Sequence, residues 1–398
     1  MRVVLLALSL HLAGATVAWG QLLPTEPISI GNGRVVLGAE ATATFASEDP
    51  GFFNYTDYEY SGVRNFRFAL AGEVRANRWL QALGELRVDH GTHVEPFAMY
   101  VRVRPWANHR LDIQAGRLPP TFGAYWRTSY TTNLLIGTPL AYQYLLSLRR
   151  DALPATTGDL LRMRGRGWLS SFPVGVVTPD RGLPIVNSVR ADHGVQVHGL
   201  NGMVEWIGAV TTGTLSNPRD DNDGVQVAGR VMVRPIPEIV IGASASSGQY
   251  LDRSLEEALP SGRKLSDGVQ RALGVDVEYS EGRFLARSEV IASRWTLPLP
   301  LTSDRNERLS ATSFLVEGRY RVLPGVQLAA RAEHLTFANL WVPGGVQRWE
   351  APVSRVELGG GYAVIRNIVL KASWQHNVRD GGRVRRESLG AVQVVYWF

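Results

Sequence analysis

Alternation between apolar and polar side chains, repeated along most of the chain, is the feature that most restricts its fold. Phe66, Phe68 and Leu70, for example, share one parity, and Arg67 and Glu73 share the other. Because successive side chains of a β-strand point to opposite faces, this period predicts strands with one apolar and one polar face. A soluble β-sandwich would alternate in the same way, so the period alone leaves two all-β classes open.

The lengths of the connections separate these two classes. From residue 34 onward we count sixteen candidate strands, joined alternately by turns of two to five residues and by longer connections. Asn201-Gly202 is a strong hairpin signal of the short kind. The longer connections are 46–62, 119–189, 214–223, 251–268, 296–309 and 338–352. Short turns at one rim and long loops at the other are typical of antiparallel transmembrane β-barrels.

The charged side chains favour a closed barrel with a wet interior. They fall on the parity opposite the apolar one, at Arg67, Arg87, Arg102, Arg104, Arg230, Arg287, Arg319, Arg331 and Arg355, and at Glu73, Glu85, Asp89, Asp276, Glu278, Glu289, Glu317, Glu333 and Glu357. A dry core could not hold so many charges, whereas a water-filled lumen could. Strands in hydrocarbon must also close into a cylinder, because every unpaired backbone group there is costly.

Aromatic side chains near the ends of the strands fit the girdles that barrels carry at the membrane interfaces. The candidates are Trp79, Phe97, Trp106, Phe284, Tyr320, Tyr362, Trp374 and Tyr396. The alternative is that aromatic residues are simply common in β-strands.

The first residues read as a secretory signal. Arg2, an apolar stretch and small residues precede Gln21, so we expect residues 1–20 to be removed and the barrel to span 21–398. No later stretch is long and apolar enough for a transmembrane helix. The chain has no cysteine, which excludes disulfides and thiolate metal sites, and its formal charge of +6 is too modest to suggest a nucleic-acid binder.

Two short motifs resemble known families. Tyr396, Trp397 and Phe398 resemble the C-terminal strand of bacterial outer-membrane β-barrels, in which the final phenylalanine is an assembly signal. The run Gly116-Arg117-Leu118-Pro119-Pro120-Thr121-Phe122-Gly123 resembles the end of the fifth strand in phosphate-selective-type and related porins, with Thr121 in place of a proline. Together with the alternation, they make the chain similar to the sixteen-stranded bacterial porins.

The resemblance implies a place in the outer membrane of a Gram-negative-type bacterium, contact with lipopolysaccharide and the barrel assembly machinery, and a homotrimer. It also implies a long third loop that folds into each pore, for which 119–189 is the candidate. The charged residues of this loop that we expect at the constriction are Arg127, Arg149, Arg150, Asp151, Asp159, Arg162, Arg164 and Arg166. Grouped guanidinium groups would attract anions there. The alternatives are a loop facing solvent or lipopolysaccharide, or an extra hairpin near 167–177 that would make eighteen strands.

The early strands supply candidate pore-wall residues: Arg67, Glu85, Arg87, Asp89, Arg102 and Arg104. They could set up a transverse field across the pore, or they could pair with one another and play no role in selectivity.

The sequence thus predicts passive diffusion of small hydrophilic solutes or ions, with a weak preference for anions, and neither enzymatic activity nor a cofactor or metal. One alternative is a non-conducting adhesin or scaffold that acts through loops 46–62 and 251–268. A less favoured one is a hydrolase at the rim, for which His334 or His376 would be the base.

Overall fold

The computed structural model describes residues 24–55, 61–89, 93–106, 108, 110–125, 133–188, 190–299, 308–342 and 345–398. The predicted signal in residues 1–20 therefore lies outside the described residues. The barrel strands are β2 (Val35–Ala46), β3 (Phe66–Arg75), β4 (Leu80–Asp89), β5 (His93–Val103), β6 (Leu111–Leu118), β9 (Asp192–Asn201), β10 (Val204–Thr211), β11 (Gln226–Ile236), β12 (Ile239–Gln249), β13 (Val269–Glu281), β14 (Phe284–Thr296), β15 (Arg308–Leu323), β16 (Val326–Phe337), β19 (Val353–Ile365), β20 (Ile368–Arg379) and β21 (Arg386–Trp397).

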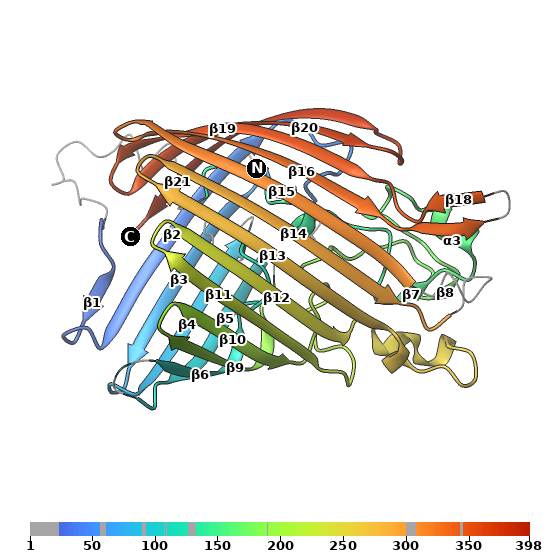
Figure 1. Ribbon diagram of the computed structural model, residues 1–398, viewed down its shortest axis with the longest axis horizontal. Coiled ribbons are helices and arrows are strands. Elements are labelled where there is room, and N and C mark those ends of the chain that lie inside the picture. The colour runs from blue at the N-terminus through green and yellow to red at the C-terminus, as the bar shows by residue number, and fades with distance from the viewer. Residues whose placement is uncertain are drawn as a thin grey trace, which may run out of the picture.

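These sixteen strands form one closed antiparallel barrel, in which each strand pairs with its neighbours in the sequence (Figure 1). The cylinder closes where β2 pairs with β21, from Glu40 opposite Trp397 to Ala46 opposite Ala391. The predicted fold and strand number are confirmed. A further strand, β1 (Ile28–Ile30), pairs with the start of β2 and lies before the region in which we counted strands.

The smaller elements all lie in the connections: α2 (Leu140–Gln143), β7 (Ala152–Leu153), α3 (Thr157–Arg162), β8 (Val174–Gly175), the 3-10 helices η2 (Arg253–Ala258) and η3 (Leu265–Asp267), β17 (Asn339–Val342) and β18 (Gly345–Arg348). β7 pairs with β8 inside the connection between β6 and β9, separately from the barrel. Of the range 167–177 considered for an extra hairpin, only Val174–Gly175 is a strand among the described residues, and it pairs with β7 outside the barrel, so the alternative of eighteen strands is wrong. Within the described residues, no helix is long and apolar enough to cross a membrane.

The two rims of the barrel differ as the connection lengths predict. Turns such as those at Gly202, Gly282 and Gly325, each with a positive φ, gather at one end together with Phe398, and we call this end the short-turn rim. The other end, on the right in Figure 1, carries the long connections with α3, η2 and the β17–β18 hairpin, and we call it the long-loop rim.

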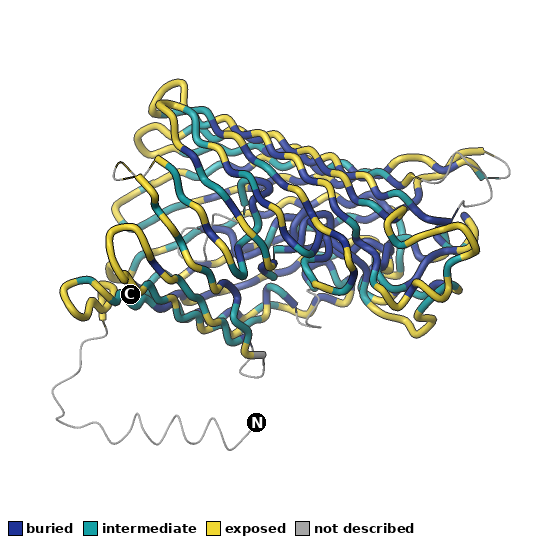
Figure 2. Tube along the Cα trace, turned by 90° about the horizontal axis from the view of Figure 1, so that it is seen from below, coloured by how far each residue is buried: buried dark blue, intermediate teal, exposed yellow. Residues whose placement is uncertain are grey.

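The strand faces also follow the predicted parity. In β13, Leu273 and Val275 are 65% and 55% exposed on the outside, whereas Gln270 and Asp276 are buried inside. Buried residues concentrate in the half of the barrel that ends at the long-loop rim, as the dark blue region of Figure 2 shows. The interior is therefore filled unevenly along the barrel axis.

Several predicted girdle residues lie exposed at or near the short-turn rim, namely Trp79, Trp106, Phe284, Tyr320 and Tyr362. Phe97 does not join them. A β-bulge at the Glu85/Leu86 step of the pairing with β4 turns Phe97 inward, where the Arg87 guanidinium carbon lies 3.2 Å from its ring centroid. A bulge shifts the parity of a strand by one residue, which simple alternation cannot show.

Candidate functional site

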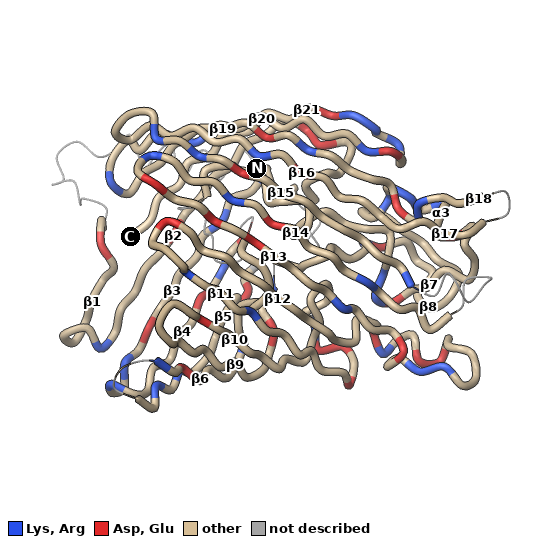
Figure 3. The backbone as a smooth tube through the Cα atoms, in the orientation of Figure 1, with Lys and Arg blue, Asp and Glu red and all other residues tan. Residues whose placement is uncertain are grey.

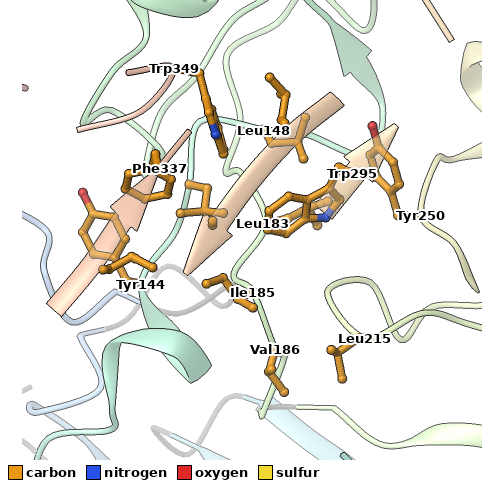
Figure 4. Packing of buried hydrophobic residues seen from close by; sticks show 14 of the residues in the cluster. Tyr144, Leu148, Leu183, Ile185, Val186, Leu215, Tyr250, Trp295, Phe337 and Trp349 are labelled. Atoms are coloured by element: carbon orange, nitrogen blue, oxygen red, sulfur yellow. The ribbon is translucent and has the colours of Figure 1, made fainter. Parts of the chain in front are cut away.

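The long connection between β6 and β9 folds into the barrel, as the resemblance implied. Its side chains Leu148, Leu183 and Ile185 pack against Trp295 of β14 and against Trp349 in a cluster of buried hydrophobic residues (Figure 4). Leu148, Ile185, Trp295 and Trp349 are fully buried. Burial of this much apolar surface holds the loop inside the barrel near the long-loop rim.

The loop enters the lumen at Phe122 and Gly123, the last two residues of the porin-like motif. Phe122 is fully buried, and its ring lies against Gly274 of β13. Gly123 has φ +80°, and a Cβ there would lie 2.1 Å from the Tyr142 hydroxyl oxygen. Its backbone N–H donates to Ser244 Oγ at 3.1 Å. The chain can make this crossing only with glycine at position 123.

A second crossing, at residues 137–140, is fixed by carboxylates of the wall. The N–H of Gly137 donates to Glu357 Oε1 at 2.9 Å, and the N–H of Leu140 donates to Glu333 Oε1 at 2.7 Å. Arg355 donates to the Thr138 carbonyl oxygen at 2.9 Å. These wall residues therefore satisfy loop backbone groups that would otherwise be buried without partners.

Arg331 joins the same carboxylates into one buried network. Its guanidinium lies 2.5 Å from Glu357, 3.2 Å from Glu333 and 3.5 Å from Glu317, and all four side chains are 0–3% exposed. We expected these charges to face open water. They are instead enclosed between wall and loop, where Arg331 also donates to the Gly137 carbonyl oxygen at 2.5 Å.

Tyr142 of α2 links the loop to the wall of β14. Its hydroxyl donates to both Glu289 carboxylate oxygens, at 2.8 and 2.9 Å. Burial, and then the charge of Glu289, raise the pKa of Tyr142 well above its usual value. The hydroxyl therefore keeps the proton that this hydrogen bond requires. Nearby, burial raises the pKa of Tyr144 to about 12.

The wall of β3–β6 differs from the part of the β11–β20 wall that the loop covers. Its inward charges are paired but partly exposed, with side-chain exposures of 16% and 10% for Arg67 and Asp89, and 22% and 28% for Arg87 and Glu85. The ion pairs are short, at 2.6 Å in both cases. Figure 3 shows both basic and acidic residues around β4 and β6. Two ion pairs of the kind weighed as the alternative to a transverse field, Arg67–Asp89 and Arg87–Glu85, are thus formed, and their side chains are partly exposed.

Two groups on this wall hold two arginines for each carboxylate. Near the short-turn rim, Asp112 lies 3.7 Å from Arg102 and 3.0 Å from Arg104. Each of these side chains is 17–22% exposed. This group of three therefore carries one more positive than negative charge.

The second such group lies toward the long-loop rim. Glu95 lies 2.5 Å from Arg117 and 3.1 Å from Arg190, and all three side chains are 17–19% exposed. Sequence reasoning assigned no site role to these residues. Arg117 lies inside the porin-like motif, so the sequence could have marked it as a site candidate. Arg190 follows the expected loop end at 189, and only the folded structure brings it next to Glu95.

The predicted constriction arginines do not form one cluster. Arg149 is fully buried and donates to Asp151 and to the carbonyl oxygens of Ser170 and Thr178, all within the loop. Arg150 reaches out of the loop instead and pairs with Asp221 and Asp252, at 2.7 Å from the latter.

The other predicted loop residues lie toward the outer surface. Arg162 is 60% exposed and pairs with Asp159, which also caps α3 through Thr156. Arg164 donates to the Asp380 carbonyl oxygen at 3.3 Å, and Arg166 is exposed. Arg127 lies outside the described residues.

Neighbouring connections pack onto this loop at the long-loop rim. Burial raises the pKa of Asp221, while hydrogen bonds from Asn217 and Arg150 oppose the rise. Leu255 of η2 is fully buried in the hydrophobic cluster. In the loop after β2, Arg355 donates to the Phe53 carbonyl oxygen at 2.9 Å. The described parts of loops 46–62 and 251–268, which were considered for an adhesin, are thus packed against the barrel at the long-loop rim.

The two candidate histidines of a hydrolase lie on the outside of the barrel. His334 Nδ1 is 2.9 Å from Ser354 Oγ, and His376 Nδ1 is 2.9 Å from Ser388 Oγ. No carboxylate is hydrogen-bonded to either ring in the part of the chain that the structure describes. The described ranges also contain no group of three or more His, Asp or Glu residues that could hold a metal ion.

The C-terminal residues complete the closure of the barrel. The Phe398 N–H donates to the Ala39 carbonyl oxygen and the Ala39 N–H donates to the Phe398 carbonyl oxygen, both at 3.0 Å. Trp397 pairs with Glu40, and the Tyr396 hydroxyl donates to the Pro24 carbonyl oxygen at 2.7 Å.

No protein-family model matches the sequence, and no curated protein matches it. Solved structures do resemble the fold. Outer-membrane-expressed OmpT of Vibrio cholerae matches with a TM-score of 0.55 at 12% identity, over 94% of this chain and all of that one. The outer membrane channel DcaP of Acinetobacter baumannii gives 0.54 at 9%, over 94% and 100%. Salmonella typhi OmpF, in complex with daunomycin, gives 0.53 at 11%, over 92% and 97%. The chain therefore has the fold of outer-membrane porins.

Proposed function

We propose that this porin-like barrel is an outer-membrane channel through which small hydrophilic solutes or ions diffuse passively. The observation that carries the proposal is the unequal burial of the inner wall. Where the loop covers the β11–β20 wall, charges such as Arg331 and Glu357 are fully buried, whereas those on β3–β6 remain partly exposed. On β13 and β14 the Glu278–Arg287 pair is also partly exposed. A passage along β3–β6 accounts for this difference. Passive flow requires no catalytic group and no cofactor.

We propose a weak anion preference for the same passage. Its two groups with surplus positive charge, around Asp112 and around Glu95, lie toward opposite ends of the β3–β6 wall. An anion moving along the wall would meet a favourable potential at each, and arginine hydrogen-bonds carboxylate and phosphate well. The neutral pairs Arg67–Asp89 and Arg87–Glu85 would contribute less. The described loop arginines would contribute little to selectivity along this wall, because they bond within the loop or lie at the long-loop rim.

Single-channel recording of the purified protein in a planar lipid bilayer tests the channel. We expect discrete conductance steps, and in a salt gradient a reversal potential of the sign that an anion preference produces. A protein that inserts into the bilayer yet stays silent at every voltage would contradict the proposal and favour a sealed barrel.

Removing the surplus charge tests the selectivity. In the double variant Arg102→Gln, Arg104→Gln we expect the anion-to-cation permeability ratio to fall toward or below unity, because Asp112 then lacks its counter-charges. The control is Arg283→Gln, Arg366→Gln, which removes the same charge from exposed positions in turns at the short-turn rim. Equal shifts in reversal potential for both variants would show that the wall group does not set selectivity.

The proposal also includes the membrane location, the oligomeric state and the assembly signal of the barrel. We place the barrel in a Gram-negative-type outer membrane, as a homotrimer whose Tyr396, Trp397 and Phe398 act in assembly. The contacts of Phe398 with Ala39 across the closing seam support that role. Chemical cross-linking in isolated membranes would test the trimer.

A further inference from the structure

The outer face of β11–β15 carries a hollow of about 750 Å³ near the long-loop rim. Small side chains form its floor, among them Gly229, Ala245 and Ala292, and Val227 and Leu273 stand beside them at 58% and 65% exposure. These residues have the outward parity of their strands. The hollow therefore opens toward the surroundings of the barrel, away from the pore.

Arginines border this hollow on the side of the long-loop rim. Arg271 and Arg294 line it and also line an adjoining cavity of about 280 Å³, to which Arg308 contributes as well. All three arginines are exposed. Asp267 lines the same cavity, so three positive charges face one negative charge.

The arrangement of these arginines is unfavourable for the isolated barrel. Arg271 and Arg294 are direct cross-strand partners on β13 and β14, where like charges destabilise the pairing. Arg294 Nε donates to Ser310 Oγ at 3.4 Å. Among the described residues, no ion pair involves Arg271, Arg294 or Arg308. An arginine on the lipid-facing side also costs free energy that grows with depth. A bound anion would remove both penalties.

We propose that this face binds a lipid of the outer leaflet whose headgroup carries phosphate. The phosphate would accept hydrogen bonds from Arg271 and Arg294, with Arg308 beside it, and one acyl chain would lie in the hollow over Gly229, Ala245 and Ala292. Guanidinium groups match phosphate oxygens in charge and geometry. The inference rests on the membrane location of the barrel and not on conduction through it.

The test measures lipid binding to the full detergent-solubilised barrel by native mass spectrometry. The probe is a six-chain glucosamine disaccharide lipid with two phosphates, compared with its dephosphorylated form and with inorganic phosphate. For Arg271→Gln, Arg294→Gln we expect affinity for the phosphorylated lipid to fall by about tenfold or more. The dephosphorylated lipid and inorganic phosphate should bind the wild-type protein more weakly.

Two further variants test whether the position of the arginines and the space in the hollow are both required. Arg283→Gln, Arg321→Gln removes the same charge from exposed positions at the short-turn rim, in the turn before β14 and near the end of β15, and should leave lipid affinity unchanged. Ala245→Leu, Ala292→Leu fills the hollow while keeping the arginines, and should also weaken lipid binding. If the arginine and control variants bind the phosphorylated lipid equally, or if inorganic phosphate binds as tightly as the lipid, the inference is wrong.

Two other outcomes have separate meanings. If filling the hollow dissociates an oligomer, the face is a contact between copies of the chain, and the lipid site is overturned. If the wild-type protein binds the lipid as described but stays silent in a bilayer, the channel function fails while the lipid site stands.

Discussion

Replacing Glu357 by alanine should lower the free energy of unfolding by about 3–5 kcal/mol, because the buried guanidinium of Arg331 then loses its nearest carboxylate. Glu357 is fully buried, 2.5 Å from Arg331, and also accepts the Gly137 N–H at 2.9 Å. The variant therefore loses an ion pair and one anchor of the loop together. Equilibrium unfolding in guanidinium chloride, in detergent micelles, measures the loss.

The matched control is Glu278→Ala. Glu278 is also an inward glutamate paired with an arginine, Arg287 at 2.7 Å, but its side chain is 38% exposed. Water replaces such a partner at little cost, so we expect a loss of about 0–1 kcal/mol. Single-channel conductance should rise in Glu357→Ala, because the 137–140 crossing is freed, and stay near wild type in Glu278→Ala. Equal loss of stability in the two variants would contradict the buried network.

Replacing Gly123 by valine should have the second large effect. The φ of +80° costs a β-branched residue about 1–2 kcal/mol, and the new side chain would collide with the Tyr142 hydroxyl, adding about 1–3 kcal/mol of overpacking. The collision would also disturb the hydrogen bond of Tyr142 to Glu289. We expect a barrel that still closes but whose loop is displaced at its entry.

Two measurements separate these effects. Thermal unfolding reports stability, and protease susceptibility of the loop in folded protein reports its displacement. The control is Gly318→Val on β15, where a Cβ would meet no atom within 4 Å, and where we expect a change within about 0.5 kcal/mol. A Gly123→Val protein as stable and as protease-resistant as Gly318→Val would show that the loop does not depend on this glycine.

Residues 116–123 of the porin-like motif show which features of the site the sequence could predict. Gly116 to Gly123 marked the end of a strand and the start of the loop, and this placement is confirmed: β6 ends at Leu118. The motif did not show that Phe122 reaches β13 or that Gly123 bonds to Ser244 on β12. Those contacts join residues more than a hundred positions apart, and no local pattern encodes them.

The wall charges show the same division. Alternation predicted that Arg87 and Glu357 both point inward, and both do. It could not predict that one would be partly exposed and the other sealed, because that depends on where the loop lies. The loop arginines were expected together on the basis of nearness in sequence, but Arg149 turns into the loop and Arg150 toward Asp252.

The sequence alone determined the closed sixteen-stranded barrel, its two unlike rims and the direction of its side chains. Each of these follows from a period of two residues and from turn chemistry, which act over a few neighbouring positions. Only the tertiary structure decided which part of the lumen is filled, which charges meet water, and that Arg271 and Arg294 face each other on the outside. Such properties depend on the packing of segments distant in sequence, where burial and pairing are set by the whole fold.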